Sequence, residues 1–133
     1  MNGIWLDNFQ DRIPRQQYSV QLSAGEETGL IITLTSNQCE VVIGFGAVHA
    51  FQMLDEGVLL QGADSEQFAA IRDQKFPSTI YEIKNGDFSR FVESQMGHEL
   101  FSALDHKQYI IVTLNYVISI VTPWEPEITV TQK

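Results

Sequence analysis

The sequence has little of what disulfide-linked, metal-binding or catalytic proteins usually carry. Its 133 residues include one cysteine, Cys39, so an intramolecular disulfide and a cysteine-based zinc site are both excluded. Cys39 is close to Val41 and Val42 in the sequence and is expected to be buried as a small hydrophobe. The three histidines, His49, His98 and His106, lack the short spacing of a metal motif. We therefore expect no metal and no cofactor, and we expect His49 to be a hydrogen-bonded structural ring inside an apolar strand.

Basic residues and long apolar runs are also scarce. Eight Lys and Arg against 17 Asp and Glu give a formal net charge of −9. Such a surface repels phosphates, so we expect neither nucleic-acid binding nor binding to an anionic membrane. The apolar runs fall short of the ~20 residues that a membrane-spanning helix needs. Residues 1–15 carry Asp7 and Asp11 where a secretory signal would be basic and then apolar, so a cytoplasmic location is expected.

Motifs for catalysis are missing as well. The sequence has no G-x-S-x-G elbow and no Ser-x-x-Lys pair. Gly44-Phe45-Gly46 is too short and apolar to hold a phosphate, and it is better explained as a bend between packed strands. The acidic pairs at 26–27 and 55–56 lie in polar turns, where carboxylates are usually solvated. We expect a protein without catalytic residues.

What is present favours one α+β domain over residues 1–133. The segment Tyr18–Ser23 alternates apolar and polar residues, which predicts a half-buried strand. Gln38–Glu56 is the longest stretch dominated by apolar and β-favouring side chains, and it predicts two central strands that bend through Gly44–Gly46. The short connections predict that the first four strands form an antiparallel meander. Counting segments gives one curved antiparallel sheet of about six to eight strands.

Two helices are expected in the middle of the chain, packed on one face of the sheet. Asp64 and Gln67 resemble a capping box and predict a helix over about 65–75. A second helix is expected over about 87–97, capped by Asp87 and ending at Gly97. Its apolar stripe is expected to face the core, at Phe88, Phe91, Val92 and Met96.

The C-terminal part of the chain predicts β structure again. Residues 109–113 and 117–121 are rich in β-branched side chains and predict a hairpin. Asn115 is expected to take a positive φ in its turn. A last short strand is expected at 128–131.

Acidic side chains gather after the central strands and suggest a binding surface for a basic protein. Exposed carboxylates attract a cationic partner, and aromatic side chains supply desolvated anchors. The residues expected to bind such a partner are Asp55, Glu56, Asp64, Glu66, Asp73, Tyr81 and Trp124. Bacterial immunity proteins and antitoxins share this profile, being small, acidic inhibitors that cover a basic toxin surface. A non-enzymatic inhibitor of that type is the function the sequence favours.

Two other functions and one assembly state stay open. A small-molecule-binding or structural domain would use the concave face of the sheet, with a pocket lined by Phe45, Phe51 and Tyr109, and acidity would serve only solubility. A hydrolase would use His49 with a nearby carboxylate. An exposed edge strand could also pair two copies into a homodimer.

Overall fold

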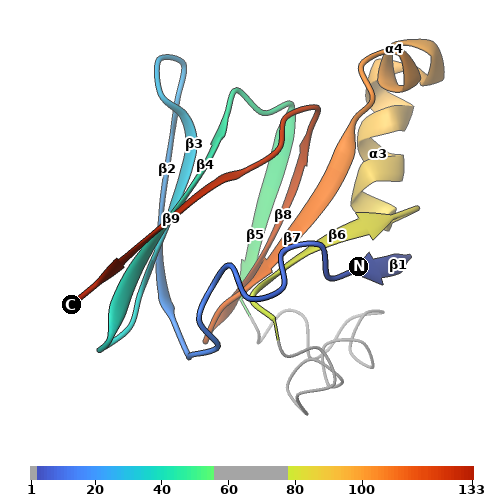
Figure 1. Cartoon of the computed structure of the whole chain (residues 1–133). Coiled ribbons are helices and arrows are strands. Elements are labelled where there is room, and N and C mark those ends of the chain that lie inside the picture. The colour runs from blue at the N-terminus through green and yellow to red at the C-terminus, as the bar shows by residue number, and fades with distance from the viewer. Residues whose placement is uncertain (1–2, 56–77) are drawn as a thin grey trace.

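Two antiparallel sheets, packed face to face, organise the chain in the computed structural model, which describes residues 3–55 and 78–133 (Figure 1). The five-stranded sheet has the order β1 (Ile4–Leu6), β6 (Ile80–Lys84), β7 (Lys107–Val112), β8 (Tyr116–Thr122) and β5 (Ala50–Asp55). The four-stranded sheet has the order β2 (Ser19–Gly25), β3 (Gly29–Thr35), β4 (Cys39–Gly46) and β9 (Glu127–Gln132). Two described helices, α3 (Asp87–Met96) and α4 (His98–Ala103), lie between β6 and β7 in the chain.

The predicted α+β class and the antiparallel pairing are confirmed, with the strands shared between two sheets where one curved sheet was expected. The helix predicted over about 87–97 is present as α3. The helix predicted over about 65–75 lies outside the described residues.

Of the four strands predicted to form an antiparallel meander, β2, β3 and β4 do so, and the fourth, β5, belongs to the other sheet because the chain changes sheets after β4. Gly46 has a φ of 68° and turns the chain out of the four-stranded sheet. The backbone N–H of His49 then donates to the carbonyl of Val121 at 3.2 Å, and β5 pairs with β8. The two strands predicted to form a central pair therefore belong to different sheets.

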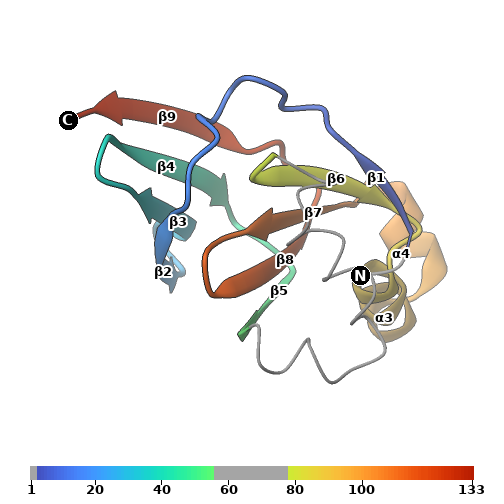
Figure 2. The ribbon, with the colours of Figure 1, turned by 90° about the horizontal axis from the view of Figure 1, so that it is seen from below.

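The main core fills the space between the sheets, seen from below in Figure 2. Tyr109 of β7 is at its centre, with ring centroids 5.8 Å from Phe9 and 5.7 Å from Phe45. Every second residue of β3 and β4 is buried against it, as strand alternation requires. Cys39 is fully buried in this core, as predicted.

The outer face of the five-stranded sheet carries a second, smaller core. Tyr81, Ile83, Ile110 and Val117 are buried there, and Trp5 packs against them from the edge strand β1. Burial on both faces explains why β6, β7 and β8 read as nearly continuous apolar runs. Helix α3 contacts β7 and β8 on this side, so its predicted placement on one sheet face is confirmed.

Helix α3 is capped by the sheet. Asp87, the predicted N-cap, is the first helical residue, and Gly86 occupies the cap position without a side chain. Gln108 of β7 supplies the missing acceptor: its Oε1 accepts the backbone N–H of Ser89 at 3.0 Å. A Cβ at position 86 would lie 2.3 Å from that oxygen, which explains the glycine. Neither helix in the described ranges is long and apolar enough to span a bilayer.

The predicted C-terminal hairpin is confirmed as β7 and β8, but its turn differs from the expected one. Among the described residues, positive φ angles outside glycine occur at Asp11, Asn85 and Asp105, so Asn115 does not adopt one. Thr113 closes the turn instead: its Oγ1 accepts the Tyr116 N–H at 3.1 Å, and its own N–H donates to the Tyr116 carbonyl at 2.9 Å.

Two glycines beside the β2–β3 turn test how closely β3 packs against β4: Gly29 lies against Gly46, and Gly25 serves as the control. Gly29 has a φ of +70°, and a Cβ there would lie 2.1 Å from the backbone oxygen of Gly46. We expect Gly29→Ala to lower the free energy of unfolding by more than about 2 kcal/mol. Gly25, its cross-strand partner, has only Thr28 Oγ1 at 3.9 Å, so Gly25→Ala should change stability by less than about 1 kcal/mol. Urea unfolding monitored by circular dichroism measures both, and equal losses would contradict this packing.

Candidate protein-binding surface

The residues predicted to bind a partner fall into three groups in the structure. Glu56, Asp64, Glu66 and Asp73 lie outside the described residues. Asp55 is exposed at the end of β5, and Trp124 is 59% exposed in the connection between β8 and β9. Tyr81 is only 3% exposed.

Tyr81 belongs to the outer core and is not available as an exposed anchor, which corrects the prediction. Its ring centroid lies 5.3 Å from that of Trp5, and its hydroxyl oxygen accepts the Ser78 N–H at 2.6 Å. Burial raises the pKa of Tyr81. The short alternation around this residue in the sequence did not reveal that β6 is covered on both faces.

Asp55 and Trp124 lie at opposite ends of the five-stranded sheet. Asp55 is opposite Tyr116 at the start of β8, whereas Trp124 follows Thr122 at its end. Six residue steps along a strand separate these ends by roughly 20 Å. The predicted residues that are described therefore do not form one patch.

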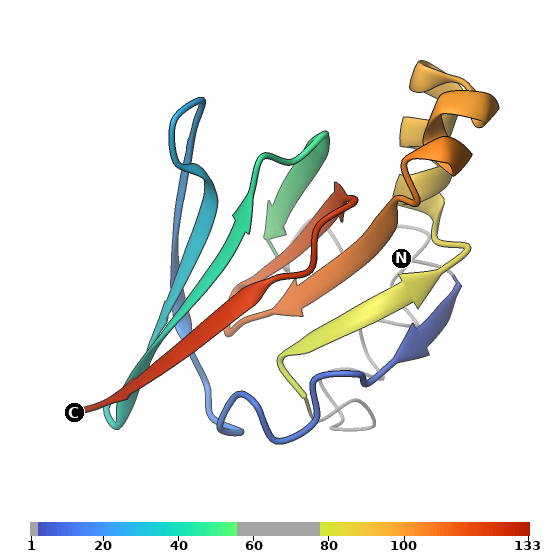
Figure 3. The ribbon, with the colours of Figure 1, turned by 45° about the horizontal axis from the view of Figure 1, so that its top comes forward.

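Trp124 lies at the end of the molecule that carries α4. This end, which we call the helical end, comprises α4, the β2–β3 turn, the β4–β5 connection and the β8–β9 connection (Figures 1 and 3). An ion pair of 3.9 Å between Lys107 and Glu125 joins the start of β7 to the β8–β9 connection. Large apolar side chains are exposed here at Leu100, Leu104 and Trp124, to 50%, 39% and 59%.

The apolar stripe of α3 is less buried than its spacing predicted. Val92 is the buried residue of this helix, and Phe91 is 58% exposed. Figure 3 shows the reason: the helices extend beyond the ends of the strands, so the sheet covers only part of α3. None of the residues of α4 is buried. Helical spacing alone cannot show where the supporting sheet ends.

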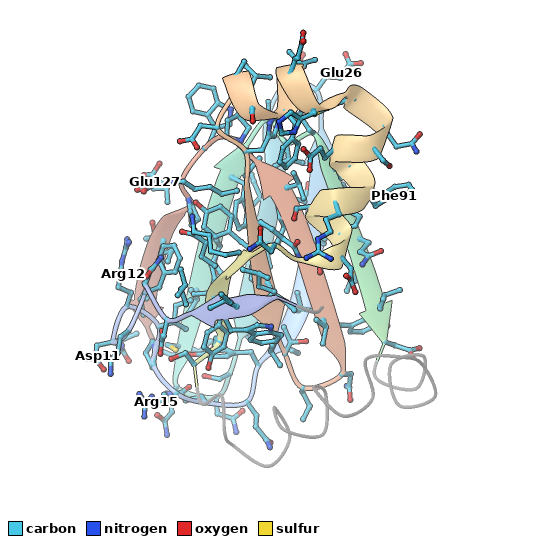
Figure 4. All side chains as sticks on the ribbon, turned by 90° about the vertical axis from the view of Figure 1, so that its right-hand side faces the viewer. Asp11, Arg12, Arg15, Glu26, Phe91 and Glu127 are labelled. Carbon is cyan, nitrogen blue, oxygen red and sulfur yellow. The ribbon has the colours of Figure 1, made fainter. Side chains whose placement is uncertain are left out.

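Exposed carboxylates lie at the same end of the molecule as these apolar side chains. Glu26 and Glu27 lie in the β2–β3 turn, Glu99 is in α4, and Asp105 follows α4; all four are exposed. Figure 4 shows Glu26 at the end of the molecule that carries α4 and Arg15 at the opposite end, with Asp11 near Arg15. The helical end therefore carries a group of carboxylates, while the region around Arg15 carries both signs of charge.

A pair of histidines, His49 and His106, lies at the same end of the molecule. The ring of His49, in the β4–β5 connection, meets that of His106 edge to face, with centroids 4.5 Å apart. His106 also stacks on Phe101 of α4 at 4.9 Å, and its Nδ1 lies 3.1 Å from the Phe101 carbonyl. His49 is exposed and lies in a connection, so the prediction of an apolar strand position is wrong. These contacts fasten α4 to the point where the chain changes sheets.

The ligand pocket predicted between Phe45, Phe51 and Tyr109 is not present as an open space between Phe45 and Tyr109. Phe45 and Tyr109, predicted to line a ligand pocket, are packed against each other in the core and exposed by only 2% and 1%, while Phe51 is 39% exposed at the sheet edge. The space between these two rings is filled.

Across residues 3–55 and 78–133, no three His, Cys, Asp or Glu side chains are grouped so that they could hold a metal ion.

The histidine pair predicts a shifted titration. Partial desolvation lowers the pKa of His49, and the charge that His106 can carry lowers it further. Because folding disfavours the proton, His49 should cost stability as the pH falls through about 6.5, its unfolded pKa. In an NMR titration we expect the pKa of His49 to lie below about 6.5 and to rise partly in His106→Phe, which keeps a ring and removes the charge.

His98 provides the control for this titration. It lies exposed at the start of α4, hydrogen-bonds to Glu93, and is not among the groups that shift the pKa of His49. His98→Phe should leave the pKa of His49 unchanged. A pKa of His49 that does not respond to His106→Phe would show that the two rings are not in contact.

Comparison with known proteins gives no indication of the function. No protein-family model, curated protein or solved structure matches the sequence or fold of this chain.

Proposed function

We propose that this chain is a non-enzymatic, cytoplasmic protein-binding domain that docks its helical end on a basic partner, as an inhibitor of the immunity or antitoxin type. The observation that carries the proposal is the exposure of Leu100, Leu104 and Trp124 among carboxylates at one end of an acidic molecule. Monomeric surfaces usually scatter large apolar side chains, and their gathering at one end favours a contact surface.

The charge distribution supports a cationic partner. The segment from α3 to the residue after Leu104 carries four carboxylates, Asp87, Glu93, Glu99 and Asp105, and one guanidinium, Arg90. Glu26 and Glu27 add to the field at the same end, and Arg15 lies far from it (Figure 4). This negative field would orient the molecule as a basic surface approaches and raise the association rate.

The exposed apolar side chains would then hold the complex. Interface energy is usually concentrated in a few large side chains that become fully desolvated, with Trp prominent among them. Trp124 is suited to that part because its side chain is 59% exposed and its backbone N–H donates to Thr122 Oγ1 at 3.2 Å, which restrains the backbone at this point. A restrained backbone reduces the conformational entropy lost on binding.

The alternatives have weaker support. A ligand pocket between Phe45, Phe51 and Tyr109 is opposed by the direct packing of two of these rings. For the hydrolase, the group that lies against His49 is a second imidazole. Any turnover retained by His49→Ala would remove that hypothesis.

Charge reversal at defined positions tests the proposal. The tagged protein is incubated with lysate of its own cells at low and high salt, and bound proteins are identified and quantified. We expect one stoichiometric basic protein, weakened at high salt because Coulomb attraction is screened over ~10 Å at 0.1 M. Glu99→Lys should slow its association roughly tenfold, and Leu100→Ala should weaken its affinity about tenfold.

Two further variants locate the surface. Glu40→Lys makes the same charge change on β4, near the end opposite α4, and should leave binding nearly unaltered. Asp55→Lys tests the surface favoured by the sequence. Loss of binding in Asp55→Lys with full binding in Glu99→Lys would place the partner elsewhere. A retained protein that is acidic, or insensitive to all three charge changes, would contradict the proposal.

A further inference from the structure

A cavity of about 180 Å³ opens where β6 and β7 separate. The pairing of β6 with β7 ends at Ile83 and Gln108. The next residue of β6, Lys84, pairs with Ile4 of β1, and the preceding residue of β7, Lys107, pairs with Thr122 of β8. The start of α3 and Phe101 of α4 line the remaining sides. This partly open space borders the helical end through Phe101 and His106, but its lining does not include Leu100, Leu104 or Trp124, and it lies next to the cap of α3.

Gln108 lines this cavity and carries a side-chain donor without a partner among the described residues. The residue is 1% exposed. Its side-chain oxygen is identified by its partner, because the Ser89 backbone N–H can only donate. The other end of the amide is therefore the NH₂ group, and Nε2 is buried without a hydrogen-bond partner among the described residues. A buried donor left unsatisfied costs about 1–3 kcal/mol, so an acceptor is expected here.

The charges around the cavity favour an anion. Three of the chain's eight basic residues line it, namely Lys84, Arg90 and Lys107, in a protein of net charge −9. The carboxylates that line it are already engaged. Glu82 accepts from Lys84 at 2.7 Å and from Asn8 at 3.0 Å, and Glu93 is hydrogen-bonded to His98.

Two of the cations, by contrast, have ion-pair partners only at a longer distance within residues 3–55 and 78–133. Arg90 lies 3.9 Å from Asp87, and Lys107 lies 3.9 Å from Glu125. Both separations exceed the 2.7–2.9 Å of a strong charge-assisted hydrogen bond, so these cations keep donors for another acceptor.

We propose that this cavity binds a small organic oxyanion, a carboxylate or a phosphate ester, with Gln108 Nε2 donating to one oxygen and Arg90 pairing with its charge. His106 contributes a second group: its Nε2 is also buried and unpartnered among the described residues. Because Nδ1 faces a carbonyl and carries the proton, the neutral ring offers Nε2 as an acceptor for a ligand hydroxyl. The volume limits the ligand, since a cavity of about 150 Å³ holds benzene.

NMR of the intact chain tests this site through the donor itself. The side-chain NH₂ signals of Gln108 are assigned by their loss in Gln108→Glu. Succinate and inorganic phosphate serve as probes of the two oxyanion types, and succinamide is the neutral control of similar size. We expect the Gln108 signals to shift and saturate with at least one anion, and the stronger response to identify the type. Succinamide should produce no saturable shift.

Two variants separate the site from general electrostatics. Arg90→Gln, on a side chain 63% exposed, should keep the fold and weaken binding about tenfold, the loss of one charge-assisted hydrogen bond. Arg15→Gln removes an equal charge at the far end of the molecule and should leave the affinity unchanged. Gln108→Glu keeps an oxygen for the Ser89 N–H, replaces the donor with an anion and should abolish binding.

The proposal fails if neither anion gives a saturable shift of the Gln108 amide, or if Arg90→Gln and Arg15→Gln weaken it equally. Glu99→Lys should leave anion binding intact. The cavity and the docking surface can therefore be disproved separately.

Discussion

The burial of two sheet faces against each other is the constraint on which the other features depend. Tyr109 is in contact with Phe9 and Phe45, so β7, the N-terminal segment and β4 meet in one core. The chain must leave one sheet and enter the other, and it does so at Gly46, where a positive φ turns the backbone. That crossing places His49 beside His106 and brings the β4–β5 connection to the end that carries α4.

The helices depend on the same strands. β7 is buried on both faces, with Tyr109 in the core between the sheets and Gln108 on the opposite face, where its oxygen caps α3. The cap fixes where α3 begins, and the stacking of His106 on Phe101 fixes α4. Because the helices extend past the strand ends (Figure 3), apolar side chains such as Leu100 stay exposed. The proposed docking surface is thus a consequence of how few residues of α3 the sheet can cover.

The sequence predicted what local patterns determine and missed what long-range contacts determine. Alternation identified the strand at Tyr18–Ser23, and helical spacing identified α3. The cap from Gln108 and the separation of β4 from β5 connect segments distant in the chain, and no local signal marks them. Both Trp124 and Tyr81 were predicted to be anchors for a partner; Trp124 is exposed, whereas Tyr81 is buried, because one strand's pattern does not show how many layers cover it. The exposure of Leu100 and Leu104 was missed for the same reason.

Hydrogen exchange of the chain, free and in complex with the basic protein it retains, tests the central claim most directly. The account predicts slower exchange on binding for amides of 97–106 and 122–127, which span α4 and the β8–β9 connection, with little change in the β3–β4 turn at the other end. The contrary result is protection centred on Asp55 with the helical end unchanged, and it would show that the acidic, apolar end of this molecule is not where its partner binds.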